Sequence, residues 1–164
     1  MRTKLIAVWI ALSLTGLAGL SSAVAQNSVA AQNGAVAVVV SEKNPVFNLS
    51  AAELRKLFTG ERHAWPGGLP VKLIVRAPGA YERIVLLRLL AMSESEYKQY
   101  WTAQVFRGEA QAQPIALFSN GMQKEAVALY PGALALVNLQ DVKPGMKVVK
   151  VGGHLPGEPG YPLN

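Results

Sequence analysis

The chain has 164 residues, of which 51% are hydrophobic and 16% are charged, and its formal net charge is +6. This composition excludes an intrinsically disordered chain, which needs low hydrophobicity and high net charge, and the length suits one domain. The absence of cysteine excludes disulfides, thiolate metal ligands and a cysteine nucleophile. With only His63 and His154 as histidines, a zinc site is not expected, and the positive charge indicates an anionic partner.

The first 25 residues have the pattern of a secretory signal peptide. Arg2 and Lys4 precede an interrupted apolar run over residues 5–20, and Ala23 and Ala25 form a small-residue cleavage pattern. An uncleaved membrane anchor is the alternative, but the run is shorter than the about 20 apolar residues needed to cross a bilayer. We therefore predict cleavage after Ala25, export to the periplasm, and no stable membrane insertion of the mature chain.

Residues 26–34 are small and polar and are expected to be flexible, and a domain is predicted over 35–151. Within it, apolar runs predict strands, and two capping boxes and several helix-ending glycines predict helices. The predicted strands cover 35–40, 71–75, 115–118, 133–137 and 146–151; the predicted helices begin near Ser50, Ala80, Ser93 and Asn120. Strands that alternate with helices predict an α/β fold with helices packed on a sheet.

The helix expected over 80–92 is apolar on most sides and is predicted to be buried. The residues predicted to supply the core are Leu54, Leu57, Phe58, Leu87, Leu90 and Trp101. The last segment, 152–164, contains four glycines and three prolines and is expected to be irregular.

No motif typical of an enzyme is present, neither a nucleophile elbow nor a P-loop nor a metalloprotease helix. Glu94 and Glu96 stand at a predicted helix start, where they are interpreted as structural because the helix dipole stabilises negative charge there. Tyr97, Tyr100 and Trp101 follow helical spacing and are assigned to the core, so no nucleic-acid partner is expected. We expect neither catalysis nor a cofactor nor a metal.

The segment RAPGAY, residues 76–81, joins a predicted strand to a predicted helix. Arg76 could direct two N–H groups at an oxyanion, and the backbone N–H groups of Gly79, Ala80 and Tyr81 would add donors at the positive end of the helix dipole. These four residues are the candidate ligand-binding residues. The alternative is structural, with Arg76 paired to a nearby carboxylate such as Glu82.

Several segments, taken in order, resemble the second lobe of PstS-like phosphate-binding proteins of ABC transporters. They are VVVSEKNPVFNLS (38–50), LSAAELRKLFTGERHAWPGG (49–68), VKLIVRAPGAYERIVLLRLL (71–90), the YW…FRG segment (100–108) and AVALYPGALALVN (126–138). The resemblance covers about 35–151. It implies a single lobe of the type II periplasmic binding-protein fold, in which helices pack on a mixed sheet.

The resemblance also implies a ligand, phosphate or another small oxyanion. The family's anion site resembles Arg-x-x-Gly-Ser-Gly-Thr; Arg76 and Gly79 match it, but Ala80 and Tyr81 stand where the family has hydroxyl donors. The chain is also too short for the family's first lobe. Two functions stay open: a weak-binding exported oxyanion-binding protein that acts with a membrane permease, or a non-transporting module that has lost the ligand and binds an envelope protein.

Overall fold

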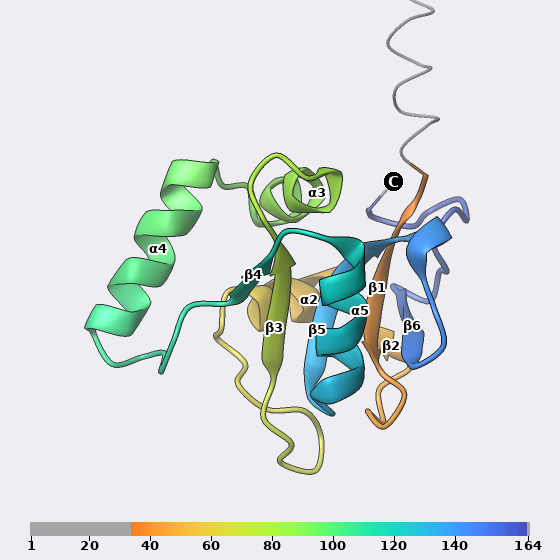
Figure 1. The fold of residues 1–164 in the computed structure, drawn as a ribbon, viewed down its shortest axis with the longest axis horizontal. Helices are drawn as coiled ribbons and strands as arrows, with labels where there is room; N and C mark the ends of the chain where they lie inside the picture. The colour runs from red at the N-terminus through yellow and green to blue at the C-terminus, as the bar shows by residue number, and fades with distance from the viewer. Residues whose placement is uncertain (1–33, 164) are drawn as a thin grey trace, which may run out of the picture. The chain divides into compact units, whose positions relative to one another are not determined.

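The computed structural model describes residues 34–163, so the predicted signal peptide and segment 26–33 lie outside the described residues. Its centre is a six-stranded mixed sheet with the order β2-β6-β1-β5-β3-β4 (Figure 1). The strands are β1 (Val36–Ser41), β2 (Asn48–Leu49), β3 (Lys72–Arg76), β4 (Ile115–Leu117), β5 (Ala133–Asn138) and β6 (Met146–Val151). The predicted α/β class is confirmed, and the very short β2 is the one strand that the sequence analysis missed.

The strand directions give the sheet two unlike ends. β3 runs parallel to both β4 and β5, so the carboxyl ends of these three strands lie at one end of the sheet. β1 runs antiparallel to β5 and β6, which places the end of β1 and the beginning of β6 at the opposite end. In Figure 1 the first of these ends is at the top, below α3, and the second is at the bottom.

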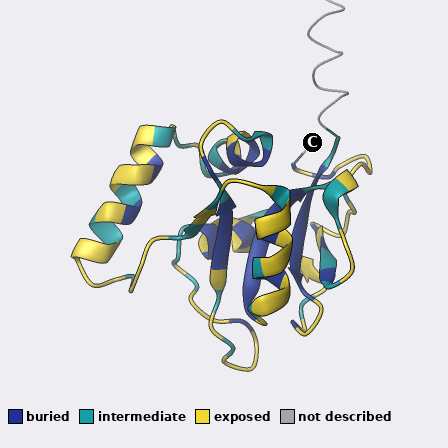
Figure 2. Ribbon diagram, in the orientation of Figure 1, coloured by how far each residue is buried: buried dark blue, intermediate teal, exposed yellow. Residues whose placement is uncertain are grey.

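Helices cover both faces of the sheet, which explains why every residue of β1 is buried. On one face, α2 (Ala51–Phe58), α3 (Tyr81–Leu90) and α4 (Glu94–Phe106) contribute to the larger apolar cluster. On the other face, α5 (Asn120–Leu129) packs on a smaller cluster through Val127. A 3-10 turn, η1 (Leu139–Asp141), follows β5. Figure 2 shows the buried strands between these partly exposed helices.

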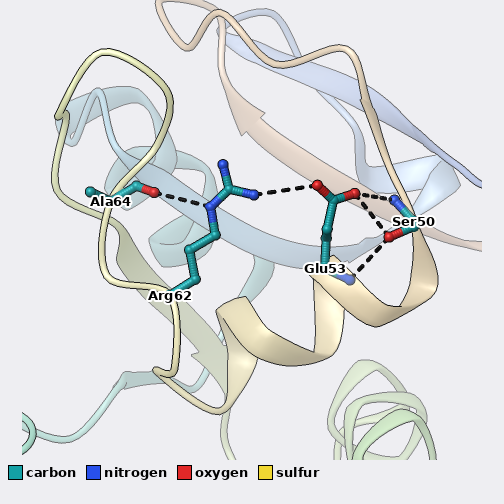
Figure 3. A network of polar contacts seen from close by, with 4 residues as sticks. All are labelled: Ser50, Glu53, Arg62 and Ala64. Carbon is teal, nitrogen blue, oxygen red and sulfur yellow. Dashed lines mark hydrogen bonds and ion pairs between the residues drawn. The ribbon is translucent and has the colours of Figure 1, made fainter.

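The capping box predicted at the start of α2 is present (Figure 3). The Ser50 hydroxyl accepts a hydrogen bond from the Glu53 N–H at 3.1 Å, and the Glu53 carboxylate accepts one from the Ser50 N–H at 2.9 Å. These bonds hold the pKa of Glu53 below its usual range. Arg62 lies 3.5 Å from the same carboxylate and donates to the Ala64 carbonyl at 3.2 Å, so the loop after α2 is tied to the start of that helix.

The burial of α3 differs from the prediction by one residue. Leu86 and Leu89 are buried, whereas Leu87 and Leu90 are half-buried against the same cluster. The helix also ends earlier than expected, because Ala91 adopts a left-handed conformation with φ of 53°. The sequence could not show which side of this helix faces the core, because leucine occupies both the buried positions and the half-buried positions next to them. The other four predicted core residues, Leu54, Leu57, Phe58 and Trp101, are buried.

The C-terminal segment has no helix or long strand, but it contributes to the core. Tyr161 and Leu163 are buried in the larger cluster. The Tyr161 hydroxyl donates to the Val36 carbonyl at 2.9 Å and accepts from the Val38 N–H at 3.3 Å. The segment was expected only to be irregular. Its position depends on β1, more than 120 residues earlier in the chain.

Candidate anion site

The candidate site lies where β3 ends and α3 begins, at the end of the sheet to which the parallel strands point. In open α/β sheets this end is where ligands bind. Arg76 is the last residue of β3, and its side chain is only 13% exposed. Gly79 turns the chain with φ of +87°, a conformation that side chains rarely adopt, and a Cβ atom there would meet nothing within 4 Å. The turn therefore leaves open space at Gly79, three residues after Arg76.

The Arg76 guanidinium is not fully satisfied by the protein. Its Nε atom lies 3.8 Å from Oε2 of Glu82, whose side chain is 8% exposed. That distance is too long for a hydrogen bond, although the two charges attract each other. Both Nε and Nη1 of Arg76 are buried and have no hydrogen-bond partner. The structural alternative, a pairing of Arg76 with Glu82, is thus present as a loose ion pair that leaves donors unused.

The start of α3 has no side-chain cap. Ala80 is the N-cap residue, and its methyl group cannot accept a hydrogen bond. The Ala80 N–H donates to the Ala77 carbonyl at 3.3 Å, so it is not free as the sequence analysis expected. Within residues 34–163, no hydrogen bond uses the N–H groups of Gly79 or Tyr81. Two of the three predicted backbone donors therefore remain unused at the positive end of the helix dipole.

A second loop borders the site, and the sequence analysis did not include it. Leu117 at the end of β4 pairs in register with Arg76 and accepts from the Ala77 N–H at 2.9 Å. The next residue, Phe118, is 78% exposed, and Ser119 then caps α5. Phe118 and the half-exposed Met122 of α5 form an apolar rim beside the site. The sequence showed a phenylalanine directly before a possible capping serine, but the exposure of its ring depends on the fold.

The other candidate residues from the sequence do not belong to the anion site. Arg83 donates to Glu94 through two bonds of 3.0 and 2.6 Å, which lowers the pKa of Glu94. The Arg83 guanidinium also lies 3.9 Å from the ring centre of Tyr97, and burial raises the pKa of that tyrosine to about 12. His63 is exposed. Residues 34–163 hold no group of three carboxylates or histidines suited to a metal ion.

A cavity of about 460 Å³ lies elsewhere, between the end of α2, the start of β3 and the loop that follows α4. Its lining includes Leu57, Leu73 and Trp101, and neither Arg76 nor Gly79 lines it. The candidate anion site is therefore separate from this cavity. Within the part of the chain that the structure describes, no helix is both long and apolar enough to cross a membrane.

No protein-family model matches the chain. Its structure is similar to that of an ABC-type phosphate transport receptor from Vibrio cholerae, with a TM-score of 0.60 and 20% identity over 74% of this chain and 48% of the receptor. PstS from Borrelia burgdorferi gives a TM-score of 0.57 at 20% identity, over 74% of this chain and 49% of PstS. The chain has a periplasmic binding-protein fold.

These comparisons confirm the fold that the sequence resemblance implied. The chain spans about half the length of the receptors that it matches. The likeness concerns the fold, and what the chain binds must be argued from its own residues.

Proposed function

We propose that the domain binds a small oxyanion such as phosphate at Arg76 and the start of α3. The observation that carries the proposal is that the Nε and Nη1 donors of Arg76 are buried and have no partner. Leaving charged donors buried and unsatisfied is costly, so an anion that accepts from them would stabilise the folded protein. The N–H groups of Gly79 and Tyr81 would add donors, and the α3 dipole would favour the negative charge.

The proposed biological role is that of an exported binding protein. Residues 1–25 would act as a signal peptide removed after Ala25, and the mature protein would work in the periplasm with a membrane permease. The fold shared with phosphate transport receptors supports this role, as does the small-residue cleavage pattern.

We expect the binding to be weak, for two reasons. Ala80 offers no hydroxyl to the anion, and the Glu82 carboxylate 3.8 Å from Arg76 repels it. An enclosed oxyanion site can reach a dissociation constant of about 1 μM. The loss of about three hydrogen bonds, at ~1 kcal/mol each, weakens binding by about two decades. We therefore expect a dissociation constant of about 0.1 mM. The affinity should fall as salt is added, because an open site is screened.

Titration calorimetry with phosphate at low ionic strength tests the proposal. Wild type, Arg76→Ala and Arg76→Gln are compared with Arg88→Ala, which removes an exposed arginine from α3, the helix that begins at the site. Both Arg76 variants should lose binding, whereas Arg88→Ala should retain it, and circular dichroism shows whether each variant is folded. Equal binding by wild type and a folded Arg76 variant would contradict the site.

The second candidate function is a protein-interaction module without a ligand. The observation that favours it is the apolar rim, since Phe118 is 78% and Met122 is 45% exposed beside the same end of the sheet. Exposed apolar groups of this kind are typical of contact surfaces. The same titration separates the two candidates, because absence of phosphate binding to folded wild type would favour the interaction module.

A further inference from the structure

A group of lysines gathers at the end of the sheet opposite Arg76, where β1 ends and β6 begins. The turn after β1 and the turn before β6 contact each other: the Glu42 N–H donates to the Gly145 carbonyl at 3.3 Å, and the Gly145 N–H donates to the Glu42 carboxylate at 2.9 Å. These turns carry exposed Lys43 and exposed Lys143. Residues 100 positions apart in sequence thus share one surface.

An exposed aromatic ring belongs to the same surface. Phe47 is 69% exposed, and the Lys147 ammonium lies 4.0 Å from the centre of its ring. Lys147 also donates to the Asn44 carbonyl, and the N–H of exposed Lys150 donates to the Phe47 carbonyl at 3.0 Å. We name the surface formed by these two turns and the ring the lysine edge, and it comprises Lys43, Phe47, Lys143 and Lys147.

The positive charge of the lysine edge is not neutralised by the protein. All four ion pairs found among residues 34–163 are made by arginines, namely Arg62, Arg76, Arg83 and Arg107. No lysine in this described range pairs with a carboxylate. Glu42 is the one acidic residue in the two turns, and its carboxylate is bonded to the Gly145 N–H. The ammonium groups of Lys43 and Lys143 therefore remain available to an external anion, and that of Lys147 keeps its charge without a carboxylate partner.

The shape of the lysine edge favours an extended anionic surface over a small ligand. Figure 1 shows the turn after β1 projecting from the lower end of the sheet. None of the four residues lines the 460 Å³ cavity. Lysines can lie flat against such a surface with their ammonium groups at its charges, while the aromatic ring inserts between them.

We propose that the lysine edge docks on an anionic phospholipid surface. The three lysines would contact lipid phosphates, and Phe47 would enter the interface between headgroups and acyl chains, as apolar side chains of peripheral proteins do. Because the lysine edge and Arg76 lie at opposite ends of the sheet, docking would leave the anion site exposed to solution. The proposal does not depend on what Arg76 binds.

Vesicle co-sedimentation tests the proposal with the full chain. Phosphatidylcholine vesicles are compared with vesicles that contain one third phosphatidylglycerol. The variant Lys43→Gln/Lys143→Gln/Lys147→Gln should lower the partition coefficient onto the anionic vesicles about a hundredfold, and Phe47→Ala should lower it about threefold. The matched control Lys56→Gln/Arg88→Gln/Lys98→Gln removes as many charges from exposed helix positions and should change it by less than about twofold.

Amine acetylation, read by mass spectrometry, locates the contact even if other parts of the chain also bind lipid. Anionic vesicles should protect Lys43, Lys143 and Lys147 but not Lys56 or Lys98. Equal losses for the two triple variants, or equal binding to neutral and anionic vesicles, would overturn the proposal. Binding to poly-glutamate through the lysine edge without binding to vesicles would also overturn it and would indicate an acidic protein partner.

Discussion

The helices α3 and α4 follow each other in the chain, yet their first turns are built in opposite ways. At α4 the Ser93 hydroxyl accepts from the Glu96 N–H at 3.2 Å, and the Glu96 carboxylate accepts from the Ser93 N–H at 2.7 Å. At α3 the corresponding position is Ala80, which has no side-chain bond to the helix. The protein's own side chains close one helix end and leave the other open, and the open end is the one beside Arg76.

This difference means that side-chain contacts along α3 hold the helix in place, and a cap at its first turn does not. Leu86 and Leu89 anchor it in the core, and Arg83 ties it to α4 through Glu94. A helix start without a side-chain cap can present its free N–H groups to a ligand. It lacks the stabilisation that a cap would supply. The predictions that follow test this division between anchoring side chains and an open end.

The largest expected effect comes from the anchor. Leu86→Ala should lower the free energy of unfolding by about 2–5 kcal/mol, because a buried leucine leaves a cavity; Leu86 is 2% exposed. Leu87→Ala, at the half-buried neighbouring position, should cost clearly less. Urea denaturation of both variants measures the two losses. If the Leu87 variant lost as much stability as the Leu86 variant, the facing of α3 described above would be wrong.

The next effect comes from the link between the two helices. Glu94→Gln should lower stability by about 1–2 kcal/mol, less than for a fully buried pair, because the Glu94 side chain is 42% exposed while that of Arg83 is 6% exposed. The Tm of the variant at neutral pH measures this loss.

The same carboxylate predicts a pH dependence with a definite sign. Hydrogen bonds from Arg83 hold the pKa of Glu94 below its usual range, so folding favours the ionised form. The stabilisation is present at neutral pH and is lost as the pH falls through the lowered pKa of the folded state. Between neutral pH and about pH 3, the Tm of wild type should therefore fall further than the Tm of Glu94→Gln. Parallel Tm curves for the two proteins would contradict this assignment.

A smaller effect is expected from exchanging the caps. Ser93→Ala should cost about 1 kcal/mol by removing the cap of α4, and Ala80→Ser should add stability of up to that amount by capping α3. Thermal unfolding of both variants measures the changes. A loss of stability in Ala80→Ser would show that α3 does not lack a cap.

The smallest effect concerns affinity and leaves the core intact. Glu82→Gln removes the negative charge 3.8 Å from Arg76 and should tighten phosphate binding by about threefold, because the anion no longer meets a like charge. Calorimetry at low ionic strength compares it with Glu125→Gln, which neutralises an exposed glutamate on α5. Unchanged affinity in Glu82→Gln would place the anion away from Arg76.

The sequence by itself determined the local structure of this protein. The β-branched run of β1, the two capping boxes and the RAPG turn each depend on residues a few positions apart, and each was predicted within one or two residues of its place. The same is true of the candidate anion residues Arg76 and Gly79, because a strand that runs directly into a helix brings its last side chain to the helix start. Local periodicity and hydrogen bonding require no knowledge of the rest of the fold.

Only the tertiary structure decided what depends on contacts between distant segments. The bonds of Tyr161 to β1 join residues more than 120 positions apart, and the lysine edge joins Lys43 to Lys143 and Lys147 across about 100. The choice between Leu86 and Leu87 as the buried residue of α3 was also set by the surface against which the helix packs. These features follow from strand order and register, since a sheet places residues side by side that the linear chain keeps far apart.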